Sequence, residues 1–289
     1  MKTKYHYPTF MSTRLMALAM VFCTMGLMIS CSTEDDSNTA RDPEPARTYY
    51  MSVDATKGDN ETASRAYNRA LSLSGKKLNA TWAIGEKVYV YAVTAYPSFW
   101  FDGSIQPQSE GTSTLLNGQI TLPSGWEGSI SDYISVTNFT LQFPRSGALD
   151  YTGQVGTLAD IATKYDYAIA TDVMFDIEAD HIIAINSASF VTQQAIVKFT
   201  LKDKADGTTL LSPTALTITY GSENISLTSI PGATYTTNGD GVLYVAIPEF
   251  SGAITLSATV GSDTYSYSKS SVTFSNGHYY DITVKMIKS

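Results

Sequence analysis

Short alternating runs of β-forming residues are the feature that most constrains how this chain folds. From about Thr48 onward, Tyr, Val, Ile and Thr recur in runs with a period of two, and Gly, Asn, Asp and Ser interrupt them. A period of two places alternate side chains on opposite faces of a strand. Many such runs with only local turns between them predict an all-β fold of β-sandwiches and disfavour parallel βαβ units.

The predicted strands are spread over this whole region. They cover residues 49–54, 69–73, 87–93, 119–122, 133–136, 140–143, 167–170, 181–185, 195–201, 214–220, 241–247, 254–260, 264–268 and 279–287. One helix is predicted over residues 158–163, because Thr157 and Asp160 have the spacing of a capping box at its start. This helix is expected to be a short connector and not a layer of the fold.

Length and a polar break predict two domains. The region after the N-terminal segment suits two domains of about 100 to 150 residues, each able to bury its own core. A small polar stretch at residues 186–192 precedes a fresh set of alternating strands. We therefore expect an N-terminal sandwich over residues 48–188 and a C-terminal sandwich over residues 189–289.

The first 30 residues predict export as a lipoprotein. Lys2, Lys4 and Arg14 precede an apolar run over residues 15–29, which is shorter than the roughly 20 residues that a membrane-spanning helix needs. The run ends at Ser30 and Cys31, as in a bacterial lipoprotein signal that is cleaved between these residues and lipidated on the cysteine. The alternative is an ordinary secretory cleavage with an incidental cysteine.

Residues 31–47 are predicted to be a flexible tether, since they hold prolines and many small polar side chains. The acidic stretch directly after Cys31 resembles the signal that sends Bacteroidetes lipoproteins to the outer face of the outer membrane; a solvated linker is the alternative. Cys23 leaves with the signal peptide and Cys31 takes the lipid, so no disulfide is expected. Stability must then come from the hydrophobic cores.

Charge and motifs exclude several classes of function. The chain has 27 acidic against 19 basic side chains, a net charge of −8, which disfavours binding to nucleic acid. No zinc-protease, nucleophile-elbow, phosphate-loop or dinucleotide motif is present, and no nucleophile with a base can be nominated. We therefore predict a protein that is not an enzyme and has no catalytic residues, metal site or cofactor.

Four strings of the sequence resemble those of one bacterial family. They are residues 69–73 (RALSL) followed by 78–90 (LNATWAIGEKVYV), residues 143–144 (FP), residues 150–158 (DYTGQVGTL) leading into 165–170 (YDYAIA), and residues 277–285 (GHYYDITVK). In this order, and after a lipoprotein signal, they resemble the fimbrillin-like proteins of Bacteroidales. The resemblance spans nearly all of the mature chain.

Each string also has a structural interpretation. Trp82 before Gly85 predicts a bulky core anchor beside a tight turn, in which glycine supplies a positive φ. In the last strand, alternation places four apolar side chains on one face, which can fill a sandwich interior: Tyr280, Ile282, Val284 and Met286.

The resemblance implies a fimbrial (pilus) subunit or accessory protein that contributes to cell adhesion. Members of the family have two transthyretin-like, Greek-key sandwiches, and they assemble after an arginine-specific protease removes the first strand. A donor strand from a neighbouring subunit then fills the groove, which is a form of β-augmentation. The implied partners are other pilus subunits, the outer membrane through the lipid, and a host or bacterial surface ligand.

Three arginines flank the predicted first strand. Arg65 ends the polar loop after the strand, and cleavage there would release the strand together with the lipid. Arg69 is a competing site nearer the next strand, whereas cleavage at Arg47 would detach only the lipid. The alternative is that Arg65 is a surface arginine of a permanently anchored protein. The candidate donor is the last strand, and closure of its own domain is its alternative role.

One aromatic loop supports a second function. Tyr96, Phe99, Trp100 and Phe101 lie close together around a proline and could form a platform for sugar rings or for another protein. A cell-surface glycan-binding lipoprotein is therefore the alternative function. Burial of these rings in a loop over the end of the sandwich is the structural alternative.

Overall fold

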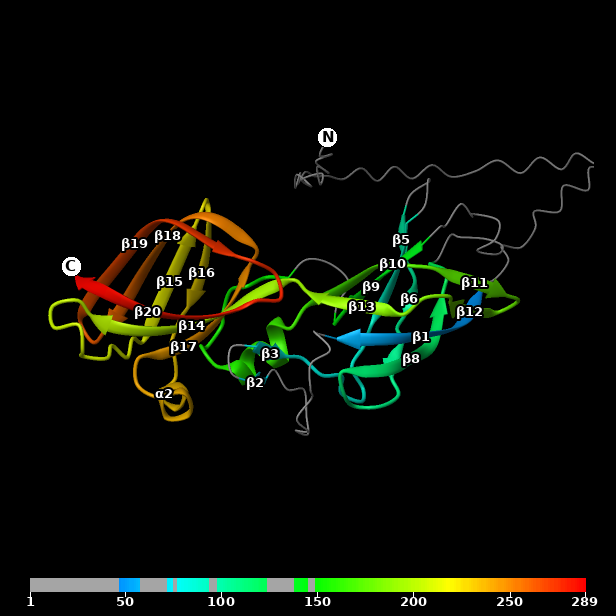
Figure 1. Cartoon of the computed structure of the whole chain (residues 1–289), viewed down its shortest axis with the longest axis horizontal. Coiled ribbons are helices and arrows are strands. Elements are labelled where there is room, and N and C mark those ends of the chain that lie inside the picture. The colour runs from blue at the N-terminus through cyan, green and yellow to red at the C-terminus, as the bar shows by residue number, and fades with distance from the viewer. Residues whose placement is uncertain (1–46, 58–71, 75–76, 94–97, 124–137, 145–148) are drawn as a thin grey trace, which may run out of the picture. The chain divides into compact units, whose positions relative to one another are not determined.

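The computed structural model describes residues 47–57, 72–74, 77–93, 98–123, 138–144 and 149–289 (Figure 1). Its main elements are an eleven-stranded and a seven-stranded sheet, each folded around a hydrophobic core. A hairpin of β2 (Ser72–Ser74) and β3 (Lys77–Asn79) forms a separate small sheet. The predicted all-β fold with two sandwiches is confirmed.

The first sheet is built around the strand that comes first in the sequence. Its strands are β1 (Thr48–Lys57), β4 (Tyr89–Val93), β5 (Phe99–Trp100), β6 (Asp102–Gly103), β7 (Gln106–Pro107), β8 (Ser113–Thr121), β9 (Asn138–Phe143), β10 (Ala168–Val173), β11 (Phe175–Glu178), β12 (His181–Ala184) and β13 (Ala188–Thr192). Their order is β11-β12-β1-β13-β10-β9-β4-β5, and β8 pairs with β1, β6 and β7. Because β1 pairs with strands on either side of it, it holds an interior position.

The second sheet has the order β16-β15-β18-β19-β20-β14-β17. Its strands are β14 (Gln194–Asp203), β15 (Ala215–Tyr220), β16 (Glu223–Leu227), β17 (Val242–Pro248), β18 (Phe250–Val260), β19 (Asp263–Phe274) and β20 (Tyr279–Lys288). Figure 1 shows β15, β16, β18 and β19 in one layer and β14, β17 and β20 in the other. The alternate side chains of β14 fill the space between them: Ala195, Val197, Phe199 and Leu201.

The two sheets divide just before Gln194. Strand β13 pairs with β1 and β10 in the first sheet, and β14, the first strand of the second sheet, begins at Gln194. The domain boundary at residue 188 stays a prediction. Small and polar residues obscured this strand in the sequence, but Ala188 and Phe190 alternate inward as in any half-buried strand.

The predicted helix forms with part of its predicted cap. α1 (Leu158–Asp160) continues as one turn of π-helix, η2 (Ile161–Tyr165). The Thr157 hydroxyl accepts a hydrogen bond from the Asp160 backbone N–H at 3.1 Å, as expected of a cap. The Asp160 carboxylate does not complete the box, because it accepts from the Val155 backbone N–H at 3.0 Å.

A second helix was not predicted. α2 (Gly232–Asn238) has the sequence GATYTTN, which lacks apolar periodicity and is rich in poor helix formers. Its Thr234 is buried and donates to the Val155 carbonyl at 3.1 Å. Tertiary contacts therefore stabilise a helix that local propensity does not favour.

The segment that contains α1 protects an open edge of the second sheet. β17 is a terminal strand of that sheet, and the buried Gln154 side chain pairs with it. Gln154 Nε2 donates to the Ala246 carbonyl at 2.8 Å, and its Oε1 accepts from the Ala246 N–H at 2.7 Å. The Gly156 carbonyl accepts from the Tyr244 N–H at 2.9 Å. These bonds satisfy backbone groups that would otherwise be open to pairing with another chain.

Trp82 is a core anchor beside a turn, as predicted. It is 1% exposed and packs edge-on against the rings of Phe143 and Phe190, with centroids 5.6 and 5.0 Å away. Gly85 has a φ of +87°, which confirms the predicted tight turn.

We expect Gly156→Ala to lower the stability of the second sandwich by about 2–5 kcal/mol. Gly156 has a φ of +83°, and an added Cβ would lie 2.6 Å from Leu243 Cδ2. Backbone strain and overpacking against Leu243 would therefore both lower the free energy of unfolding. The measurement is urea denaturation followed by circular dichroism.

Gly277→Ala is the matched control in the same sandwich. Gly277 has a similar φ of +73°, but an added Cβ would meet no atom within 4 Å. The loss of stability should come from backbone strain alone, about 1–2 kcal/mol. Equal losses in the two variants would show that the contact with Leu243 is unimportant.

Candidate functional site

The place that β1 occupies in the first sheet is the candidate functional site. Along one edge, β1 pairs antiparallel with β8 from Thr48 to Thr56. Along the other edge it pairs in parallel with β12 through residues 50–52 and then with β13 through residues 55–57. Since both edges are bonded, loss of β1 would leave two rows of unpaired backbone groups.

The inward face of β1 is part of the core. Its alternate residues Tyr49, Met51, Val53 and Ala55 are at most 2% exposed and contribute to the cluster that fills the first sandwich. Figure 1 shows β1 in blue between strands that come much later in the chain. Removal of β1 would therefore open a groove lined by core side chains.

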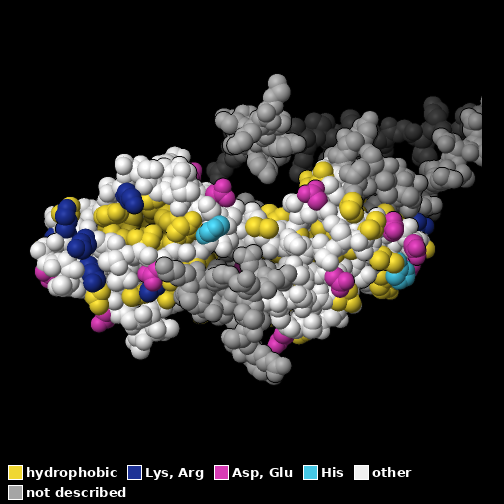
Figure 2. All heavy atoms as spheres, viewed as in Figure 1, with side chains coloured by type: hydrophobic (Ala, Val, Ile, Leu, Met, Phe, Trp, Pro, Cys, Tyr) yellow, Lys and Arg dark blue, Asp and Glu magenta, His cyan; other side chains and the backbone are white. Residues whose placement is uncertain are grey.

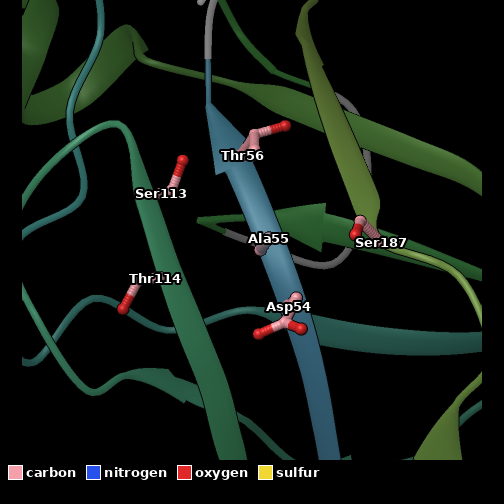
Figure 3. A pocket seen from close by; sticks show the side chains of 6 residues that line it. All are labelled: Asp54, Ala55, Thr56, Ser113, Thr114 and Ser187. Carbon is pink, nitrogen blue, oxygen red and sulfur yellow. The ribbon is translucent and has the colours of Figure 1, made fainter.

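The hydrogen bonding of β1 changes partner halfway along its second edge. Pairing with β12 ends at Ser52, and pairing with β13 begins at Ala55. A hollow of about 390 Å³ lies beside this interruption, and Figure 3 shows its lining side chains from β1, β8 and the residue before β13: Asp54, Ala55, Thr56, Ser113, Thr114 and Ser187. The hollow therefore lies against residues 54–56, in the second half of β1.

Lys57, the last residue of β1, is buried on the inward face. It is 1% exposed, and its Nζ lies 2.7 Å from Asp166 Oδ2 and 3.8 Å from Glu86 Oε1. Both acids are themselves buried. A charge in such a place is tolerated only when it is paired, so the three side chains depend on one another.

Two aromatic rings complete the surroundings of the lysine. The Lys57 ammonium lies 3.6 Å from the centroid of the Phe143 ring and 5.0 Å from that of the Trp82 ring. The negative face of an aromatic ring attracts a cation, most strongly where water is excluded. We call Asp166, Glu86, Phe143 and Trp82 the lysine socket.

The lysine socket joins strings that were recognised separately in the sequence. Trp82 and Glu86 belong to the string over residues 78–90, Phe143 to the string FP, and Asp166 to the string YDYAIA. The sequence did not predict a role for Lys57, because the predicted first strand ends at residue 54. The period of two could have predicted its burial, because Lys57 continues the series of inward residues Tyr49, Met51, Val53 and Ala55.

The candidate donor strand β20 closes its own sandwich in this structure. It pairs in parallel with β14 over residues 279–286, but with β19 only through Tyr265 and Ser266. Of its four inward residues, Val284 and Met286 are buried, whereas Tyr280 and Ile282 are partly exposed. Closure of its own domain is therefore a present role of β20, and a donor role requires its release.

The aromatic loop is mostly interior where the structure describes it. Phe99 and Phe101 are buried, with 7% and 3% exposure, and Phe101 packs against Phe139. Trp100 is half-buried, and its ring tilts by 45° against Tyr91. Two of the four aromatics are thus unavailable for a surface platform, which favours the structural interpretation of this loop.

Several predicted site residues lie outside the described residues: Ser30, Cys31, Arg65, Arg69 and Tyr96. Within the described part of the chain, no group of three or more His, Cys, Asp or Glu side chains is arranged to hold a metal ion. In that same part, no helix has the length and apolar character needed to cross a membrane.

We expect Lys57→Met to destabilise the first sandwich by about 3–5 kcal/mol, because it removes the cation that lies 2.7 Å from the buried Asp166 carboxylate. The three tryptophans, Trp82, Trp100 and Trp126, all precede the second sandwich in sequence. Urea unfolding followed by tryptophan fluorescence therefore reports on the first sandwich.

Two variants test the cause of this loss. Lys87→Met removes an exposed lysine and should change stability by less than about 0.5 kcal/mol. Adding Asp166→Asn to Lys57→Met should recover part of the lost stability. A Lys57→Met protein as stable as Lys87→Met would contradict the importance of the socket.

Comparisons with known proteins give structural similarities only. No protein-family model matches the sequence, and no curated protein matches it. Solved structures similar to this chain include a fimbrial protein from Bacteroides ovatus, with a TM-score of 0.38 and 11% identity over 83% of this chain and 49% of that chain. The chain thus spans about half the length of that protein.

Two further structures are similar over most of both chains. A fimbrial assembly protein from Parabacteroides distasonis has a TM-score of 0.36 and 13% identity over 82% of this chain and 90% of that chain. The tip fimbrial protein Mfa3 from Porphyromonas gingivalis has a TM-score of 0.37 and 9% identity over 84% of this chain and 98% of that chain. The solved structures that this chain is similar to therefore include fimbrial proteins.

Proposed function

We propose that this protein is a non-enzymatic subunit of a cell-surface fimbrium that assembles by exchange of β1 for a strand of another subunit. The observation that carries the proposal is the position of β1, which is first in sequence yet interior in its sheet. Such a strand can be cut from the chain at a single point while the rest of the sandwich stays connected.

The vacated place would have the properties of a strand-binding groove. Backbone groups of β8 on one side and of β12 and β13 on the other would be free to pair. The core beneath would accept alternate apolar side chains, which give β-augmentation its specificity. An open groove of this kind is unstable in water, so it favours capture of another strand.

The order of the arginines along the chain fits this mechanism. Arg65 and Arg69 follow β1 in sequence, so cleavage after either one separates β1 from the rest of the protein. Arg47 directly precedes β1, so cleavage there would leave β1 in place. The sequence resemblance to fimbrillin-like proteins supports the same step.

We also propose that the protein is located at the outer face of the cell. Lipidation of Cys31 would anchor the unprocessed protein to the outer membrane, and loss of residues 31–65 would release it into a fimbrium. Adhesion to a host or bacterial surface ligand would follow from its place in that fimbrium. The stalk, tip and anchor positions all fit this description.

We expect an arginine-specific protease to convert the native surface protein into a product that begins at Ala66 and forms ladders of oligomers. Arg65→Gln should shift the cut to Arg69, and Arg65→Gln with Arg69→Gln should abolish both the release of β1 and the ladders. N-terminal sequencing and gel electrophoresis of unheated samples measure the two results.

Arg47→Gln is the matched control, because Arg47 lies on the other side of β1 and its loss should leave the ladders unchanged. Ladders formed by the variant that lacks both Arg65 and Arg69 would refute removal of β1 as the trigger. A wild-type protein that is cut yet stays monomeric would refute strand exchange.

We expect Cys31→Ser to abolish incorporation of labelled palmitate and to move the protein out of the membrane fraction. Cys23→Ser is the control, since Cys23 lies within the predicted signal peptide and should leave labelling unchanged. Labelling that survives Cys31→Ser would show that the lipid is attached elsewhere or that the protein is not a lipoprotein.

A further inference from the structure

The lysine socket holds an amine in a place where lysine is seldom found. Figure 2 shows the dark blue side chains of lysine and arginine at the surface of the second sandwich, where Figure 1 draws that sandwich. Lys57, by contrast, is 1% exposed and points into the first sandwich from the end of β1. A lysine amine that is shielded from water is a potential nucleophile as well as a partner in an ion pair.

The amine lies next to an atom that it could attack. Lys57 Nζ is 2.7 Å from Asp166 Oδ2, and Oδ2 is bonded to the carboxyl carbon of that side chain. Asp166 follows η2 directly and stands two residues before β10, so regular structure holds its backbone on both sides. Groups held about 3–3.5 Å apart in this way react as if their concentrations were far higher than any in solution.

Hydrogen bonding at this contact is incomplete. Among the described residues, neither Lys57 Nζ nor Asp166 Oδ1 has a hydrogen-bond partner, although Nζ and Oδ2 are only 2.7 Å apart. A buried ammonium has three N–H donors, and donors without acceptors are costly to bury. An amide between the two side chains would have one N–H and one carbonyl oxygen, and it would remove two charges from the interior.

We propose that Lys57 Nζ and the carboxyl carbon of Asp166 condense to an intramolecular amide, an isopeptide bond that ties the end of β1 to the segment between η2 and β10. The inference does not depend on strand exchange. It adds a covalent modification that determines which copies of the chain can undergo that exchange.

The reaction balances without an oxidant, a reductant or a second substrate. One proton passes from the Lys57 ammonium to the Asp166 carboxylate, which gives an amine and a carboxylic acid. The electron pair of the nitrogen forms the new N–C bond, the C–OH bond breaks, and the hydroxyl leaves as water with a proton from the nitrogen. The products are one amide and one water molecule. Burial favours the first transfer, because two neutral groups are less costly to bury than two charges.

Glu86 is placed to carry a proton during this step. Its Oε1 lies 3.8 Å from Lys57 Nζ, and its Oε2 accepts a hydrogen bond from the Ala83 N–H at 3.2 Å in the turn before β4. Catalytic hydrogen bonds are often this long before the reaction and shorten in the transition state. Oε1 would take the proton from the attacking nitrogen and deliver it to the departing hydroxyl of Asp166.

The aromatic part of the lysine socket protects the product. The ring centroids of Phe143 and Trp82 lie 3.6 and 5.0 Å from Lys57 Nζ, and both rings are buried. A site closed in this way excludes water and so prevents hydrolysis of the amide.

The bond determines whether β1 can leave. Arg65 and Arg69 lie between Lys57 and Asp166 in sequence, so a chain that is cut after either arginine stays joined through the amide. Only a copy without the bond can give up β1 for another strand. A copy with the bond keeps β1 and, with it, the lipid predicted at Cys31, as a membrane-anchored subunit must.

Tryptic digestion of the denatured native surface protein tests the bond. An acylated Lys57 resists trypsin, so we expect the peptide of residues 48–65 to be joined to the peptide of residues 165–198. The mass of the joined species should be the sum of the two peptide masses less one water molecule, and fragmentation should locate the link. Cleavage after Lys57 in all of a folded protein, with both peptides separate, would overturn the proposal.

A matched pair of variants tests which lysine reacts. Lys57→Arg keeps a cation beside Asp166 but removes the primary amine, and we expect it to abolish the joined peptide. Lys87→Arg alters an exposed lysine and should leave the joined peptide unchanged. Circular dichroism of both variants before digestion shows that each is folded. A joined peptide that survives Lys57→Arg would show that another side chain forms the link.

Glu86→Gln tests the proton carrier. In pulse-labelled protein, we expect the joined peptide to form at least about tenfold more slowly than in the wild type, because a positioned carboxylate accelerates proton transfer by about 10²–10⁴-fold. A merely structural role would change the urea midpoint of the folded variant without slowing this step. An unchanged rate would overturn the role of Glu86 and leave the bond intact.

The same digestion separates this inference from strand exchange. After cleavage at Arg65, we expect the joined peptide only in monomers and not in the ladders of oligomers. Ladders that contain the joined peptide would refute the exchange of β1 and leave the bond intact. Cut copies without the bond that stay monomeric would also refute strand exchange.

Discussion

The pairing of β1 with β8, β12 and β13 is the interaction on which the first sandwich depends. A single strand near the start of the chain completes the backbone hydrogen bonds of three strands that are encoded later. Its inward side chains fill the middle of the core that those strands enclose. Because these contacts join residues far apart in sequence, the sandwich cannot be complete until β1 is in place, and any strand that replaces it must supply the same bonds and volume.

The buried lysine adds a requirement that apolar packing alone would not impose. Hydrophobic side chains of similar size can substitute for one another in a groove, so alternate apolar residues select a strand only loosely. The buried Asp166 carboxylate is less tolerant, since a strand without a cation at the position of Lys57 would leave a buried charge without its closest cation. Phe143 and Trp82 surround that position with buried aromatic rings, and charge interactions are stronger in buried surroundings.

In the second sandwich, an edge strand is protected by side-chain and backbone hydrogen bonds from a neighbouring segment. Gln154 and Gly156 cover the edge strand β17 with hydrogen bonds, which protects it from pairing with another chain. Within the sheet, the neighbouring strands β19 and β20 meet only at one end. One edge of this sandwich is thus closed by its own chain, whereas its interior strand β20 is only partly paired along one side.

The sequence by itself determined the all-β class, the alternating faces of most strands, the core position of Trp82 with its turn at Gly85, and the capped start of α1. These features depend on local periodicity and turn chemistry, which neighbouring residues encode. Only the tertiary structure decided that β1 is interior, that β13 belongs to the first sheet, that α2 forms, and that Lys57 meets Asp166 and Glu86. Those outcomes depend on contacts between residues far apart in the chain, and a buried lysine has the same letter in the sequence as an exposed one.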